Sequence, residues 1–99
     1  MLIRIVKMTF HPEFVPEFRS LFDQFKSRIA AAEGCSHLSL LRDAGNENVY
    51  FTYSHWDGPE FLELYRNSDT FQEVWPRTKA GFAARPEAWS LIPQEQNIS

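Results

Sequence analysis

The sequence has one cysteine, few glycines and no long apolar run. Cys35 is alone among 99 residues, so it cannot form an internal disulfide, and it fits a reducing compartment. No stretch reaches the roughly 18 apolar residues that a membrane span needs. The N-terminal segment MLIRIVKMTF lacks the long apolar core and the cleavage site of a signal peptide. We therefore expect a cytoplasmic protein with no membrane partner.

Excess positive charge and the common cofactor motifs are also absent. Ten Lys and Arg against 13 Asp and Glu give a net charge of -3, and no basic stripe is present to neutralise phosphates. The four glycines are scattered singly, so no phosphate-binding loop is formed. Neither paired cysteines nor closely spaced histidines indicate a metal site. The sequence thus predicts no nucleic-acid partner, no metal and no cofactor.

Aromatic residues are abundant instead. They make up 15% of the chain, with nine Phe, three Trp and three Tyr. A small monomer does not normally bury that much aromatic bulk, so either a ligand pocket or a subunit interface is expected. The alternative is that these rings simply form an aromatic-rich core.

Hydrophobic periodicity predicts alternating strands and helices. Residues 2–10 alternate as a strand, and a turn at His11 then leads into a helix that tolerates Pro16 near its start and is capped by Gly34. One apolar stripe runs along that helix: Val15, Phe18, Phe22, Phe25, Ile29 and Ala32. The other expected elements are strands 35–43 and 48–56, helices 60–67 and 69–82, and a last strand 87–92.

This order of elements predicts the fold class and the assembly. A β-α-β-β-α-β order with its second helix split in two is an α+β, ferredoxin-like plait with a four-stranded antiparallel sheet. We expect one domain over residues 1–99, with a core from 2–92 and a polar tail from 93–99. The strands carry apolar residues on both faces, but helices cover only one face. The other face predicts a homodimer whose two sheets face each other.

An aromatic and polar cluster on the short helices and neighbouring strands is the candidate site. Trp75 and Lys79 are four residues apart and would share one helical face, although Pro76 between them can kink the helix. Such a lining suits a flat aromatic ligand. His55, next to a Trp at a strand end, is the histidine most suggestive of function. The full cluster is Trp56, Tyr65, Phe71, Trp75, Lys79 and Trp89.

Several local signatures together resemble the antibiotic-biosynthesis-monooxygenase-like family over residues 2–92. They are a helix ending in EGC before a strand, the stretch VYFTYSHWDGPEFLELYRNSDTF, and the closing strand. The stretch SDTFQEVWPRTKAGFAARPEAWS further resembles a branch whose reactions are not generally established. The resemblance implies a dimeric α+β barrel. It also implies oxidation of phenols or quinols by dioxygen without metal or flavin, or, in some members, breakdown of haem.

The haem-degrading pattern of that family is absent. It has a His where Trp75 stands, a Trp where Tyr65 stands, and an Asn on the first strand where Val6 or Lys7 falls. A Trp cannot ligate iron through its N–H. Haem breakdown by a His-ligated mechanism is therefore not expected.

Two hypotheses about function remain open. The first is a cofactor-independent monooxygenase of a small aromatic or quinol-type substrate, in which Tyr65 and Lys79 are catalytic. Tyr65 would position the oxygen function and Lys79 would favour an anionic form. The residues expected to bind the substrate are Trp56, Phe71, Trp75, Trp89 and His55. The second is a non-catalytic dimer that binds a hydrophobic metabolite. An open cavity bearing Tyr65, Trp75 and Lys79 would favour the first.

Overall fold

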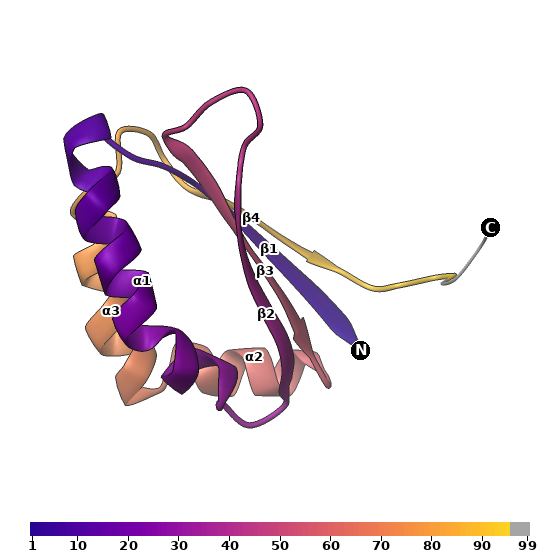
Figure 1. Cartoon of the computed structure of the whole chain (residues 1–99). Helices are drawn as coiled ribbons and strands as arrows, with labels where there is room; N and C mark the ends of the chain where they lie inside the picture. Colours follow the sequence, from indigo (N-terminus) through magenta and orange to yellow (C-terminus); the bar gives the residue numbers. More distant parts are fainter. Residues whose placement is uncertain (96–99) are drawn as a thin grey trace.

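A computed structural model describes residues 1–95, and its element order confirms the predicted β-α-β-β-α-β arrangement (Figure 1). The second helical region is split in two, as expected. The predicted tail at 93–99 lies partly outside the described residues. The elements are β1 (Leu2–Thr9), a 3₁₀ turn (Pro12–Phe14), α1 (Val15–Ala30), β2 (Cys35–Arg42), β3 (Val49–Trp56), α2 (Pro59–Arg66), α3 (Asp69–Lys79) and β4 (Glu87–Leu91).

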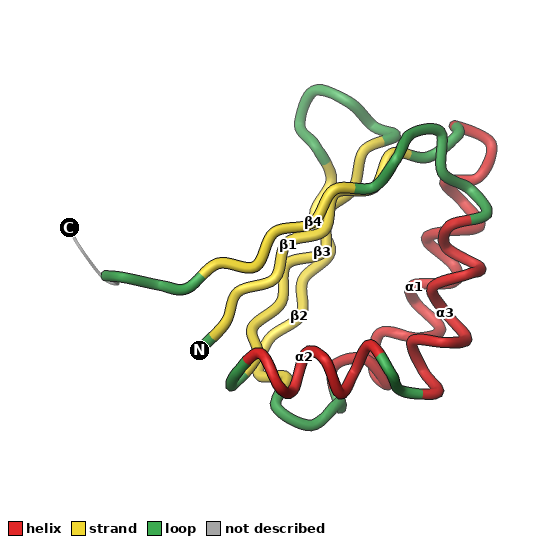
Figure 2. The backbone as a smooth tube through the Cα atoms, turned by 180° about the vertical axis from the view of Figure 1, so that it is seen from behind, coloured by secondary structure: helices red, strands yellow, loops and turns green. Residues whose placement is uncertain are grey.

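The four strands form one antiparallel sheet in the order β2-β3-β1-β4. Strand β1 is central: Leu2 pairs with Trp56 of β3, and Ile3 pairs with Leu91 of β4. All helices lie on one side of this sheet (Figure 2). Helices α1 and α3 run side by side, and α2 closes one end of the space between them and the sheet. The α+β, ferredoxin-like prediction is confirmed.

Helix α1 buries its predicted apolar stripe but ends earlier than expected. Phe18 and Phe25 are buried against the sheet side, and Pro16 lies in the first turn, where its missing N–H costs no helical bond. The helix ends at Ala30, so the prediction that Gly34 caps it is wrong. Residues 31–33 form an additional turn, and Gly34 follows with a left-handed φ of 82°. Gly34 therefore lies in the turn just before β2, not at the end of α1.

Most of the core lies between α1 and the sheet, in two clusters. In the first cluster Phe10 stacks on Phe18 with ring centroids 4.3 Å apart. Part of the aromatic content is thus ordinary core, which was the alternative to a pocket. The first cluster consists of Met8, Phe10, Phe18 and Tyr50, and the second of Leu21, Phe25, Ile29 and Val74.

The sheet face opposite the helices carries no helix in the described part of the chain (Figure 2), and it presents apolar side chains together with His55 and the Lys7–Glu87 ion pair. Strand alternation places Ile5 on this face, where it pairs with Tyr53 on one side and Trp89 on the other. Trp89 and Leu91 are 41% and 45% exposed. Every helix within residues 1–95 falls short of the length and hydrophobicity needed to cross a bilayer.

Candidate functional site

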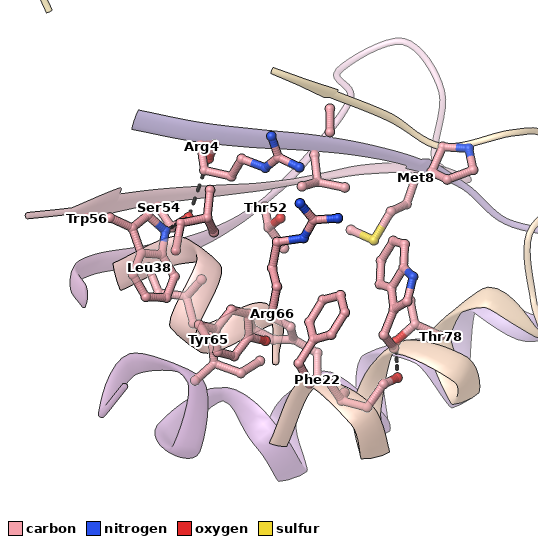
Figure 3. Close-up of a pocket in the computed structure, with 18 of the residues that line it drawn as sticks. Arg4, Met8, Phe22, Leu38, Thr52, Ser54, Trp56, Tyr65, Arg66 and Thr78 are labelled. Carbon is pink, nitrogen blue, oxygen red and sulfur yellow. Dashed lines mark hydrogen bonds between the residues drawn. The ribbon is translucent and has the colours of Figure 1, made fainter. Parts of the chain in front are cut away.

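A cavity of about 310 Å³ lies between the sheet and the three helices (Figure 3). Its volume is at the lower end of the range of small-molecule sites, so it suits a compact ligand. Strands β1 and β3 form most of one wall, α1 and α3 form the facing wall, and α2 closes one end. Most of the lining is apolar. Its aromatic members are Phe18, Phe22, Trp56, Tyr65, Phe71 and Trp75.

Four of the predicted site residues form one continuous aromatic wall of this cavity. Trp56 of β3 stacks on Tyr65 of α2, with ring centroids 5.3 Å apart. Tyr65 meets Phe71 of α3 edge-on at 5.4 Å. Phe71 then stacks on Trp75 at 5.6 Å, with the two planes inclined by only 15°. This aromatic wall offers the faces and edges on which a planar ligand packs.

The connection between α2 and α3 sets the geometry of this wall. Ser68 caps α3: its Oγ accepts a hydrogen bond from the Phe71 N–H at 3.2 Å. The same hydroxyl donates to the Tyr65 carbonyl at 2.6 Å. One side chain therefore joins the end of α2 to the start of α3 and fixes Tyr65 next to Phe71.

Trp56 is held in place by its own hydrogen bond. It is only 1% exposed, and its Nε1 donates to Ser54 Oγ at 3.0 Å. Ser54 Oγ in turn donates to the Arg4 carbonyl at 3.4 Å, as the dashed lines in Figure 3 show. A buried indole N–H that already has a hydrogen-bond partner needs none from a ligand. Trp56 thus acts as a rigid wall.

Tyr65 remains protonated over an unusually wide pH range. Removal from water raises the pKa of its hydroxyl to about 12, with a smaller contribution from the nearby Cys35. Tyr65 is therefore neutral at pH 7, and its O–H can donate a hydrogen bond to a ligand oxygen.

The raised pKa of Tyr65 predicts a loss of stability in alkali. The native state holds the Tyr65 proton more tightly than the unfolded chain does, so its stabilising effect is complete below about pH 10 and is lost as the pH rises toward about 12. The shift corresponds to on the order of 2–3 kcal/mol. Urea unfolding at about pH 9 and about pH 11.5 should show this loss in the native protein and a smaller one in Tyr65→Phe. An equal loss of unfolding free energy in the native protein and in Tyr65→Phe would contradict the raised pKa of Tyr65.

Two arginines that are not among the predicted site residues also line the cavity. Arg4 projects from the central strand β1, and Arg66 ends α2; Figure 3 shows their guanidinium groups extending into the same space. Burial lowers the pKa of Arg4, and the charge of Arg66 lowers it further. None of the described residues that line the cavity is acidic. The lining is therefore mostly apolar, with two positively charged side chains and no described negative one.

Lys79, which is predicted to lie beside Trp75, is not among the residues that line the cavity. It is exposed at the last position of α3. The cavity-facing side of this helix carries Val74 and Thr78, which are buried. Lys79 is one turn beyond Trp75, but Trp75 is only half buried at the edge of the cavity-facing side of α3. The next turn on that edge is therefore exposed to solvent, and Lys79 with it. The positive charge expected from Lys79 is supplied by Arg4 and Arg66 instead.

His55 and Trp89 are on the opposite side of the sheet from the cavity. Residues 54 and 56 face the helices, so strand alternation turns His55 away, where its Nε2 hydrogen-bonds Tyr53 Oη at 3.0 Å. Trp89 alternates in the same way with Ala88, which lines the cavity. Within residues 1–95, no group of three or more His, Cys, Asp or Glu could hold a metal ion.

Comparisons with known proteins agree on one fold. The family model described as antibiotic biosynthesis monooxygenase matches residues 1–76. A conserved protein from Methanosarcina mazei Go1 has a TM-score of 0.86 at 24% identity, covering 92% of this chain and 91% of its own. The structure of an antibiotic biosynthesis monooxygenase has a TM-score of 0.90 at 15% identity, and the match covers 96% of this chain and 100% of that one. A protein from Mycobacterium tuberculosis has a TM-score of 0.88 at 16% identity, and the match covers 96% of each chain.

These solved structures are less than 25% identical to the chain, so their likeness is one of fold. No protein of curated function gives a significant match.

Proposed function

The chain belongs to the antibiotic biosynthesis monooxygenase family, and we propose that it is a cofactor-independent monooxygenase of a small aromatic or quinol-type substrate. One observation carries this proposal: a cavity that combines a continuous aromatic wall with two cationic side chains, Arg4 and Arg66. An aromatic wall holds a ring, and cations favour the deprotonated ring, which is the form that reacts with dioxygen.

The proposed reaction needs no external electron donor. A quinol and dioxygen give a hydroxyquinone and water: one oxygen atom becomes the new ring hydroxyl, and the other leaves as water. The ring supplies all the electrons that reduce both atoms. Lowering the pKa of a substrate hydroxyl by two units requires about 2.7 kcal/mol of preferential binding of the anion. One or two charged hydrogen bonds supply that amount.

Each side chain of the cavity has a separate role in this proposal. Trp56 and Trp75 hold the ring at the two ends of the aromatic wall, and Phe71 packs between them. Tyr65 donates a hydrogen bond to a substrate oxygen, which its high pKa allows at all physiological pH values. Arg4 and Arg66 stabilise the anion. The apolar lining keeps water away from the reacting carbon.

We also propose that the protein is a homodimer that pairs through the uncovered sheet face. On that face Trp89 and Leu91 are exposed next to the half-buried Ile5 and Tyr53, and large apolar side chains exposed together mark an interaction surface. A second copy supplies the same surface by two-fold symmetry. The cavity lies on the other side of the sheet, so each protomer would keep a site of its own.

A non-catalytic binding protein is the second candidate, and one observation favours it. The tyrosine in the cavity has its pKa raised to about 12, away from the neutral range where a proton acceptor works. A site without a base holds a ring as well as a site with one.

Oxygen consumption distinguishes the two candidates. With 1,4-dihydroxynaphthalene as substrate, the native protein should consume oxygen well above the rate of uncatalysed autoxidation. Tyr65→Phe, which loses the hydrogen-bond donor to the developing anion, should lower kcat about tenfold or more. Tyr53→Phe makes the same change on the opposite sheet face and should leave kcat unaltered. Binding without consumption above autoxidation would favour the non-catalytic candidate, and an unchanged kcat in Tyr65→Phe would remove that residue from the mechanism.

A further inference from the structure

Two like charges share the cavity with no acidic partner inside it. Arg4 Nη1 donates to Ser90 Oγ at 2.8 Å, a neutral partner that orients the guanidinium and leaves its charge unbalanced. Arg66 is half exposed at the cavity mouth, and its described acidic neighbour, Glu63, is on the outside with Oε2 3.9 Å from Nη1. A contact that long and that exposed contributes little. The positive charge is therefore directed at whatever enters the cavity.

The ligand that best fits this arrangement carries its own negative charge. Arginine remains charged under all ordinary conditions, so two neighbouring guanidinium groups in a partly apolar site repel each other until an anion arrives. A phenol or quinol, with a pKa near 10, enters neutral at pH 7 and balances neither charge. A carboxylate enters ionised, is planar, and accepts paired hydrogen bonds from guanidinium forks.

We propose that the ligand of this cavity is an aromatic carboxylate. Its ring lies against the wall formed by Trp56, Tyr65, Phe71 and Trp75, and its carboxylate lies between Arg4 and Arg66 near the mouth (Figure 3). The volume of about 310 Å³ suits one ring or a fused pair. This inference rests on the proposed function for its assignment of the cavity as the substrate site, and it narrows the substrate to ring compounds with an acid group.

A matched pair of ligands tests the charge requirement under nitrogen, where no oxygenation occurs. 2-Naphthoate and 2-naphthamide have the same ring and nearly the same shape, and only the first is charged. Titration followed by tryptophan fluorescence should show the naphthoate binding at least about tenfold more tightly, with an affinity that falls as salt is added. Equal affinities for the two compounds would overturn the proposal.

Arginine variants then test which side chains recognise the charge. Arg4→Gln and Arg66→Gln should each weaken naphthoate binding about tenfold and leave naphthamide within about twofold. Arg85→Gln removes the same charge from an exposed loop before β4 and should change neither affinity. Unchanged naphthoate affinity in Arg66→Gln would overturn the proposal. Arg66 is exposed, so this variant decides the matter even if Arg4→Gln does not fold.

The proposed carboxylate ligand and the proposed reaction can each fail without the other. Selective naphthoate binding together with no oxidation of 1,4-dihydroxy-2-naphthoate would uphold the carboxylate site and reject the monooxygenase. Oxidation of 1,4-dihydroxynaphthalene with no preference for naphthoate would uphold the monooxygenase and reject the carboxylate site.

Discussion

Ile5→Glu should convert the protein from a dimer into monomers. Ile5 lies in the middle of the central strand, on the sheet face without helices, between Tyr53 and Trp89. In the proposed dimer this position is buried against the second sheet, and an unpaired carboxylate there costs several kcal/mol. In the monomer the same carboxylate is hydrated and costs little. Sedimentation velocity at micromolar concentration should therefore give the mass of one chain for the variant and of two for the native protein.

A control separates the effect of position from the effect of charge. Gln24→Glu adds the same charge on the exposed side of α1 and should stay dimeric. A native protein that sediments as a monomer, or an Ile5→Glu variant that sediments as a dimer, would reject the sheet-to-sheet interface.

Gly34→Ala should destabilise the protein by about 2–5 kcal/mol. The residue has a φ of 82°, a conformation that costs a side-chain-bearing residue about 1–2 kcal/mol. An added Cβ would also lie 2.3 Å from Phe61 Cγ, and relieving such overpacking costs about 1–3 kcal/mol. Urea unfolding measures the sum. Gly45→Ala, where the nearest atom to the added Cβ is 3.5 Å away, should change stability by no more than about 0.5 kcal/mol.

The same substitution links packing to the site. Phe61 belongs to α2, the helix that carries Tyr65 and Arg66 into the cavity. The Gly34 carbonyl also accepts a hydrogen bond from Asp57 N–H at 2.8 Å, just before α2 begins. Moving Phe61 therefore shifts α2 relative to β3, and ligand affinity should fall along with stability. A Gly34→Ala variant as stable as the native protein would contradict this account, because it would show that Phe61 moves away from the added Cβ without cost.

The order of elements could be predicted from the sequence because each element carries its own local signal. Alternation marked the strands, and the stripe from Phe18 to Ile29 marked α1. Trp56, Tyr65, Phe71 and Trp75 could be grouped as a site because their elements are neighbours along the chain and aromatic residues are distinctive. The end of α1 could not be predicted, because Gly34 has the left-handed conformation typical of a helix cap but lies in the turn before β2, and the helix already ends at Ala30.

The charged part of the site could not be predicted in the same way. The position of Arg4 depends on which strand face turns toward the helices, and that face is set by pairing with Ser54 and Ser90, far away in sequence. The same alternation turns His55 and Trp89 away. For α3, the i, i+4 rule relates Trp75 to Lys79 but does not fix how the helix rotates on the sheet. One signal was present: a lone arginine among apolar residues on a central strand.

The fate of the two atoms of dioxygen is the measurement that tests the proposed reaction most directly. A quinol should be oxidised under heavy-isotope dioxygen by the native protein freed of metal and flavin, with mass spectrometry of the product and of the water formed. The proposed reaction predicts one labelled atom in the hydroxyquinone and one in water, at a rate that Tyr65→Phe reduces. An unlabelled product with labelled hydrogen peroxide, or turnover no faster than autoxidation, would contradict it.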